Sequence, residues 1–312
     1  MNDKNNNFVN QSLSETNFIK EFLIIAFTKK ILIFSITSIM TALFVFISLS
    51  IPNIYKSEAL LMQSQSQQSS LGMLNQYSSV ASFAGITLPS NSGDRSQEAI
   101  ERIKSYEFFI NYFLPNILLE NLMASKSWNS FTDTILYDDK IFDSSTDMWI
   151  RKVSPPAKPR PSGQDAFLAY KKIMEISQDK KTGFVTVSVK HLSPNIAKQW
   201  TQNIIVSINQ SMRDQEKNKT MLAINFLNNQ AQKMNYEDIK KAIANLQQEQ
   251  MKSLMLIEAN EEFVFKVLDS PIAPERKFEP RRSIIVFWGF MLGIVLSLIV
   301  IFFTDLKNKT FK

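Results

Sequence analysis

Residues 283–304, SIIVFWGFMLGIVLSLIVIFFT, form a run of 22 residues without a charged side chain. A second run of 21 such residues covers positions 31–51, ILIFSITSIMTALFVFISLSI, and ends before Pro52. Roughly 20 apolar residues in a helix cross the hydrocarbon core of a bilayer. A buried core helix would explain one run, but two at opposite ends of the chain favour two transmembrane helices. A signal peptide is the alternative for the first run, which is longer than the usual ~7–15 apolar residues and lacks a small-x-small cleavage site.

Lysines in the two short tails predict the orientation, because basic residues flanking a span favour the cytoplasmic side. The tails are residues 1–30 and 305–312, and their basic side chains are Lys4, Lys20, Lys29, Lys30, Lys307, Lys309 and Lys312. Two spans place both tails in the cytoplasm and residues 52–282 outside. Arg281 and Arg282 lie on the outer side and oppose this assignment, but large translocated domains largely ignore the rule.

Composition excludes several classes of site. The 312 residues contain no Cys and one His, which argues against a zinc site, an Fe–S cluster or a disulfide framework. The seven glycines give neither GxGxxG nor GxxxxGK[ST], so no nucleotide site of these types is expected. The net charge is +6, but residues 52–282 hold 28 basic and 25 acidic side chains of interspersed sign. We therefore expect no nucleic-acid partner, no metal and no cofactor.

Patterns within residues 52–282 predict an α+β domain. Alternating apolar residues predict strands at 55–62, 182–190 and 263–268, and an amphipathic pattern predicts a helix over 165–176. No Gly or Pro occurs between 195 and 270, where an apolar stripe predicts a long helical region. Strands flank this region and the second span follows closely. The helical region must therefore project away from the sheet and return to it, bending near residues 228–236. The predicted architecture is a mixed α/β base on the membrane with a projecting helical arm at about 194–259.

The basic, proline-rich segment RKVSPPAKPRP at 151–161 has two interpretations. Proline favours extended backbone, so the segment is either a stiff connector or a docking motif for another protein or a lipid headgroup.

The segment after the predicted arm, EANEEFVFKVLDSPIAPERKFEPRRSIIVFWGFMLG at 258–293, resembles the closing segment of the Wzz chain-length determinants, the polysaccharide co-polymerases. In that family a strand is followed by a proline-rich stretch directly before the second span. The resemblance is best over residues 182–304, whereas 63–160 match only in general layout. It implies a bacterial inner-membrane protein with a large periplasmic domain. It also implies a homo-oligomer that acts with a membrane polymerase on a lipid-linked glycan, such as the O-antigen of lipopolysaccharide.

Three sets of residues are candidate functional positions. Pro271, Pro274 and Pro280 predict a stiff strap between the last strand and the second span, or only a stop that keeps helix out of that stretch. The membrane-edge pair Arg281 and Arg282 would bind anionic headgroups or acidic parts of a lipid-linked glycan. Finally, the spacing of Gly289 and Gly293 permits close packing against another transmembrane helix.

No residue pattern predicts catalysis. His191 has no second His, and the carboxylate pairs Asp138–Asp139 and Glu261–Glu262 are typical of a solvated surface. Three functions remain: a non-enzymatic regulator of glycan chain length, a structural component of capsule or exopolysaccharide export, and a two-span sensor. A sensor needs a cytoplasmic output module, and residues 305–312 are too short for one; they also contain no kinase motif.

Overall fold

The computed structural model describes residues 28–64, 92–233 and 236–310, and the chain forms two compact units within these ranges. The helix-pair unit contains the described residues up to Asn53 and from Phe278 onward. The α+β unit contains the described residues from Ile54 to Lys277. Most of the N-terminal tail, up to residue 27, lies outside the described residues.

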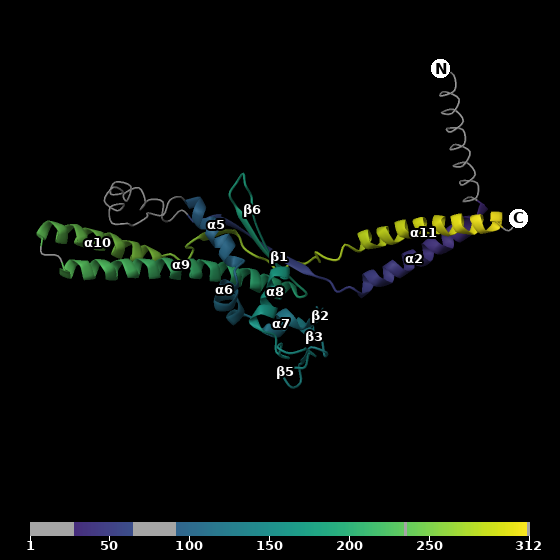
Figure 1. The fold of residues 1–312 in the computed structure, drawn as a ribbon, viewed down its shortest axis with the longest axis horizontal. Coiled ribbons are helices and arrows are strands. Elements are labelled where there is room, and N and C mark those ends of the chain that lie inside the picture. Colours follow the sequence, from purple (N-terminus) through teal and green to yellow (C-terminus); the bar gives the residue numbers. More distant parts are fainter. Residues whose placement is uncertain (1–27, 65–91, 234–235, 311–312) are drawn as a thin grey trace, which may run out of the picture. The chain divides into compact units, whose positions relative to one another are not determined.

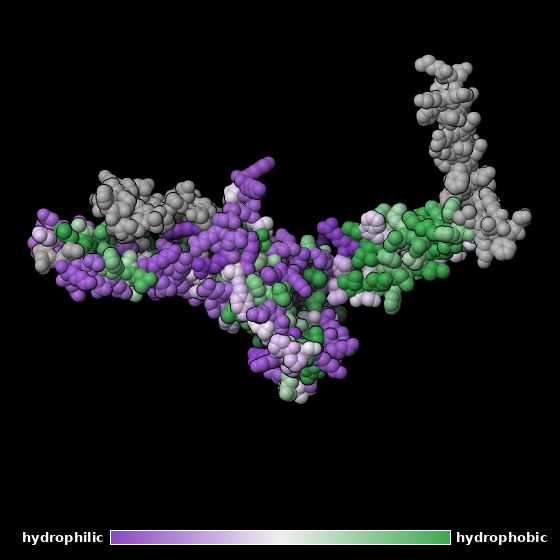
Figure 2. All heavy atoms as spheres, in the orientation of Figure 1, coloured by the Kyte–Doolittle hydropathy of each residue, from purple (hydrophilic) through white to green (hydrophobic). Residues whose placement is uncertain are grey.

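The helix-pair unit consists of α2 (Lys30–Ser50) and α11 (Arg282–Thr310), which pack side by side (Figure 1). By length and composition, Lys30–Ser50 and Arg282–Thr304 are apolar enough to cross a membrane. Their outward surfaces are hydrophobic (Figure 2), and side chains such as Phe34, Phe46 and Phe303 are exposed. Such a surface is unfavourable in water and suits lipid.

The α+β unit is built on a four-stranded antiparallel sheet in the order β6-β7-β1-β8. Its strands are β1 (Tyr55–Gln63), β6 (Met174–Gln178), β7 (Val185–His191) and β8 (Phe265–Asp269). The central pair is in register from Tyr55 opposite His191 to Leu61 opposite Val185. Alternate residues of β1 and β7 are buried, as expected for a sheet that packs on one face.

The long helix α9 (Pro194–Lys233) covers the buried face of the sheet with its N-terminal half. Trp200, Ile204 and Ile208 recur at helical spacing and are fully buried there. Beyond the sheet, α9 continues beside the antiparallel helix α10 (Glu237–Ala259), forming the helical arm (Figure 1). Leu227 and Ile243 are buried within the arm. The predicted α+β class with a long helical arm is confirmed. Helix α9 continues to Lys233, past the start of the predicted bend at 228–236, and residues 234–235 of that bend lie outside the described residues.

A cluster of aromatic side chains completes the core. It comes from α5 (Ser92–Ile103), α6 (Tyr106–Phe108), the π-helical turn η2 (Phe109–Phe113) and α8 (Gly163–Ile173), with η3 (Leu114–Asn116) and α7 (Leu119–Met123) beside it. Tyr170 is central: its ring lies 4.8 Å from that of Phe113 and its hydroxyl donates to Ile103 O. Phe113 in turn contacts Trp200 of α9, so these helices and the sheet share one core.

The structure corrects the predicted helix over 165–176. Helix α8 ends at Ile173, and Met174–Gln178 is strand β6, paired with β7. Apolar residues at 174 and 176 continue the helical spacing, but the edge of β7 offers them backbone partners. The strand predicted at 263–268 begins at Phe265 in the structure, two residues later than predicted.

Residues 124–150 hold two small hairpins that the sequence did not predict. The first pairs β2 (Ser125–Asn129) with β3 (Thr134–Tyr137), and the second pairs β4 (Phe142–Asp143) with β5 (Met148–Trp149). These strands are too short to show a clear alternation.

The proline-rich segment 151–161 is a closed loop, so its prediction as an extended connector is wrong. The Arg151 guanidinium donates to Pro159 O and Lys158 O and pairs with Asp165 at 2.6 Å. The hydrogen bond from Arg151 also lowers the pKa of the Asp165 carboxyl. Arg151 therefore ties both ends of the loop to the start of α8.

Candidate functional site

Strand β8, which leads into the proline-rich stretch, is fastened to α9 by a buried asparagine. Asn209 is 5% exposed, and its Oδ1 accepts hydrogen bonds from the backbone N–H groups of Val264 and Phe265 at 2.8 and 2.9 Å. Its Nδ2 donates to Phe265 O at 3.0 Å. One side chain therefore pairs three backbone groups at the start of β8, and couples this strand to the arm helix.

The stretch after β8 is held against β1. Pro271 is buried, and the carbonyl oxygen of Ile272 accepts a hydrogen bond from Ser57 Oγ at 2.7 Å. The hydroxyl of Thr201 on α9 donates to Ser57 O. Pro274 is half-buried, and the α+β unit ends shortly after it, at Lys277.

Pro280, Arg281 and Arg282 belong to the helix-pair unit, so the predicted proline-rich strap is divided between the two units. Arg281 is exposed, and α11 begins at Arg282. Arg282 donates to Asn53 Oδ1 at 3.2 Å, which joins the start of α11 to the residues just after α2. The two arginines therefore differ: Arg281 is accessible, whereas Arg282 is partly committed to a contact within its own unit.

Gly289 and Gly293 face α2. A Cβ on Gly289 would collide with the Phe44 side chain, and a Cβ on Gly293 would lie 2.9 Å from Thr37 Cα. The same face of α11 continues one turn at a time through Ser297 and Ile301, both fully buried. At the far end, Lys29 Nζ donates to Thr304 Oγ1 at 3.0 Å. The small residues Gly289, Gly293 and Ser297 allow the two apolar helices to approach closely.

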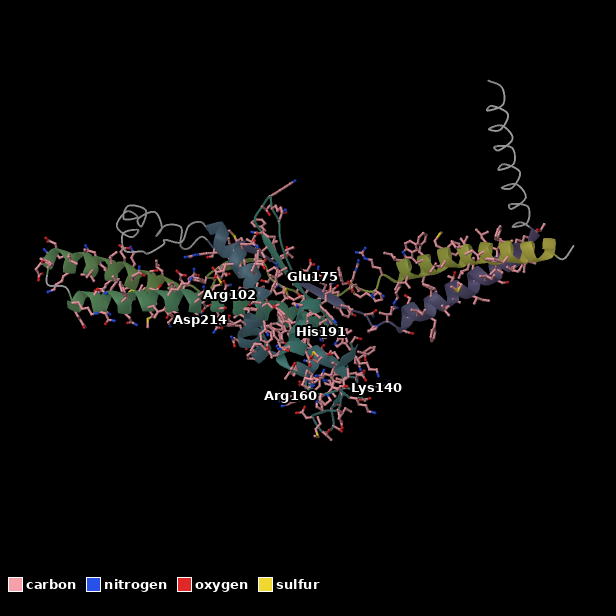
Figure 3. All side chains as sticks on the ribbon, in the orientation of Figure 1. Arg102, Lys140, Arg160, Glu175, His191 and Asp214 are labelled. Carbon is pink, nitrogen blue, oxygen red and sulfur yellow. The ribbon has the colours of Figure 1, made fainter. Side chains whose placement is uncertain are left out.

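His191, labelled in Figure 3, has both ring nitrogens engaged within the packed part of the α+β unit. Nε2 lies 3.0 Å from Asn121 O, and Nδ1 accepts the N–H of Ser193 at 3.0 Å. Its ring contacts Trp200, and burial lowers the pKa of His191. This neutral, fully hydrogen-bonded imidazole orders the turn between β7 and α9.

One carboxylate of each pair singled out in the sequence makes a local hydrogen bond. Asp138 Oδ1 accepts the N–H of Lys140 in a turn, and Glu262 Oε1 accepts the N–H of Val267. Among the described residues, no three His, Asp or Glu side chains are grouped as a metal site.

A polar cleft of about 650 Å³ lies between α5, η2 and α9. Arg102, labelled in Figure 3, is a basic residue of its lining and contacts Glu98, Ser211 and Gln215. Tyr112 and Phe108 stack on one wall. The described lining of the cleft consists mainly of hydrogen-bonding and charged groups, and the Tyr112 hydroxyl donates to Asp214 Oδ2 at 3.5 Å.

Comparisons with known proteins find similarity at the level of structure. No family model and no curated protein matches the chain. Among solved structures, the chain is similar to a full-length bacterial polysaccharide co-polymerase, with 14% identity, 92% of this chain and 97% of that chain covered, and a TM-score of 0.42.

A second solved structure is a fragment of WzzB, a polysaccharide co-polymerase from Salmonella Typhimurium. Its identity to this chain is 13%, with 73% of this chain and 100% of the fragment covered, and the TM-score is 0.32.

The sequence predicts functional roles for the prolines, arginines and glycines. It does not single out Asn209, Ser57 or Thr201. One signal for Asn209 was present, because an asparagine interrupts the apolar run Ile204, Ile205, Ile208 and Met212. A polar side chain in such a position needs a buried partner. Ser57 and Thr201 carried no comparable signal.

Proposed function

We propose that this protein is a non-enzymatic regulator of surface polysaccharide chain length. It acts in the bacterial inner membrane as a homo-oligomer, together with a membrane polymerase. Its substrate-side partner is a lipid-linked glycan, such as the O-antigen of lipopolysaccharide or a related polymer. The sequence resemblance of residues 258–293 to the chain-length determinants supports this proposal.

The observation that carries the proposal is the connection from the arm to the apolar helix α11. Asn209 fastens the arm helix to β8, Ser57 holds the chain directly after β8, and three prolines follow before α11. Proline fixes φ, so this stretch resists coiling and bending. A displacement of the arm is thereby passed to the membrane helix, where a polymerase in the same bilayer senses it.

The placement follows from the basic tails. Residues 1–30 and 305–312 lie in the cytoplasm, residues 31–51 and 283–304 span the membrane, and 52–282 lie in the periplasm. Arg281 contacts lipid headgroups or the pyrophosphate of the lipid-linked glycan at the outer membrane edge. Gly289 and Gly293 keep the two spans of one protomer together.

The homo-oligomer is supported by exposed apolar side chains on the arm. Leu222 and Phe226 lie one turn apart on α9 and are 70% and 56% exposed. Exposed apolar side chains at this spacing favour contact with another helix. The α9–α10 pair leaves them uncovered, so a neighbouring protomer covers them.

Deletion of the gene tests the proposal against the export alternative. Without a length regulator, polymer is still made and reaches the surface, but with a broad distribution skewed to short chains. Loss of an export component instead leaves polymer inside the cell. Gel profiles of surface glycan, combined with fractionation of intracellular polymer, distinguish the two, and intracellular retention would overturn the assignment.

A further inference from the structure

The hairpin of β2 and β3 displays one aromatic side chain fully to the outside. Phe131, in the turn between the strands, is 97% exposed, the highest value among the large apolar side chains of the described residues. Single exposed apolar side chains are common on protein surfaces, so the meaning of Phe131 depends on where its hairpin lies in the fold.

The turn that carries Phe131 is well ordered by its own side chains. Asn129 Oδ1 accepts the N–H of Phe131 at 3.0 Å, and Trp128 Nε1 donates to Asp133 Oδ1 at 2.8 Å. Asp133 adopts a φ of 50° and also accepts a hydrogen bond from Asn195 Nδ2 at 2.7 Å. The turn is therefore held by four residues in a shape that leaves Phe131 outside.

The hairpin lies at one particular end of the sheet. Trp128 packs edge-on against Tyr55, the first residue of β1, with ring centroids 5.4 Å apart. Tyr55 pairs with His191 at the end of β7, and Asn195 belongs to the first turn of α9. The hairpin thus sits at the end of the sheet where the chain enters from α2.

The chain also leaves the α+β unit at this end. Strand β8 runs antiparallel to β1, and Ile272 beyond it bonds to Ser57, near the start of β1. Both connections to the apolar helices therefore depart from the end of the sheet that bears the hairpin. Tyr55 follows Ser50, the last residue of α2, by five positions, which is at most about 18 Å of extended chain. If α2 spans a bilayer, this end of the sheet therefore stays within that reach of the bilayer surface.

The hairpin that carries Phe131 also exposes one apolar and one basic side chain. Leu136 is 55% exposed on β3, and Lys126 is exposed on β2. Phe and Leu together with Lys are typical of segments that lie in the boundary between headgroups and hydrocarbon. We propose that the β2–β3 hairpin inserts Phe131 into the periplasmic headgroup region, a membrane contact beyond the two spans.

A protein partner fits this feature less well. A stable protein interface buries about 800 Å² on each side, whereas the tip offers one aromatic ring flanked by exposed Ser130 and Thr132. A lipid contact can be this small because the spans already hold the chain at the surface, at high effective concentration. The proposal rests on α2 and α11 spanning a bilayer, and it does not depend on chain-length regulation.

Because the chain has no Cys, one introduced cysteine gives a unique probe site. The test uses full-length Phe131→Cys labelled with bimane, in nanodiscs of phosphatidylethanolamine and phosphatidylglycerol. The matched control is Met255→Cys on α10, another exposed apolar position, 64% exposed. Fluorescence is quenched separately with aqueous iodide and with lipids carrying a nitroxide near the headgroup.

We expect the nitroxide lipid to quench the probe at 131 and not the probe at 255. Iodide quenching is expected to be weaker at 131 than at the control position, because a tip in the headgroup region is shielded from the aqueous ion. Equal iodide quenching at both positions would overturn the proposal. Protection from iodide without quenching by the lipid nitroxide would also overturn it, because a protein surface would then cover the tip.

Discussion

The side chain of Asn209 holds the backbone of Phe265 from both sides: Nδ2 donates to its carbonyl at 3.0 Å, and Oδ1 accepts its N–H at 2.9 Å. This places an amide normally found at surfaces inside the α+β core, at the joint between the arm and β8. The first prediction concerns this joint.

Replacing Asn209 with Ala leaves two buried N–H groups and one carbonyl without partners, since Val264 N–H also bonds to Asn209. Unpaired buried backbone groups cost about 1–3 kcal/mol each, so we expect the free energy of unfolding to fall by about 3 kcal/mol. The control is Gln202→Ala on an exposed turn of the same helix, which is expected to change it by less than about 0.5 kcal/mol. Urea denaturation followed by circular dichroism measures both, and equal effects would contradict the assigned role.

Replacing Gly293 with Ala is expected to loosen the pair of apolar helices. The added Cβ would lie 2.9 Å from Thr37 Cα, a backbone atom that cannot move aside alone. Overpacking of this kind costs about 1–3 kcal/mol. Val295→Leu, on the exposed side of α11, is the control. Unfolding in mixed detergent micelles reports the difference, and unchanged stability of Gly293→Ala would show that the helices do not need this close approach.

The stability of the α+β unit is expected to fall between pH 7.5 and pH 5. Burial lowers the pKa of His191 below its ordinary 6.5, so the unfolded chain binds a proton first as the pH falls. The contribution of His191 is therefore complete above pH 6.5 and is lost below it, towards the lowered pKa of the folded state. His191→Gln removes this titration, and its denaturation midpoint should depend less on pH over this range. A pH dependence identical to that of the wild type would exclude His191 as the cause.

Replacing Leu222 and Phe226 together with Ser is expected to weaken self-association. Both side chains are exposed on the arm, so the change costs the monomer little while removing apolar contact area. Asn229→Ser, another exposed position on α9, is the control. Amine-reactive cross-linking in intact membranes should give fewer high-order species only for the double variant. Unaltered cross-linking would place the interface elsewhere.

Much of this architecture could be predicted because its signals are local. Two uncharged runs, the alternation around Val185–His191 and the absence of Gly and Pro after Pro194 each depend on neighbouring residues alone. The sequence thus predicts the two apolar helices, the central strands and the arm.

The errors arise where partners distant in sequence decide the structure. The sequence of β6 continues the helical spacing of α8, but this segment forms a strand because it pairs with β7. The loop at 151–161 is closed by Arg151 reaching carbonyls seven and eight residues away. Likewise, Ser57 and Ile272 are 215 positions apart, so nothing local marks their hydrogen bond.

The most direct test of the account is the length profile of the surface glycan in a deletion strain complemented with different forms of the protein. The wild-type protein should restore a preferred length. The Pro271→Ala, Pro274→Ala, Pro280→Ala triple variant should accumulate in the membrane but give a shifted or blurred distribution, because Ala releases the fixed φ and permits helix. A wild-type profile from the triple variant at equal protein level would contradict the strap, and an unchanged profile on deletion of the gene would contradict length regulation itself.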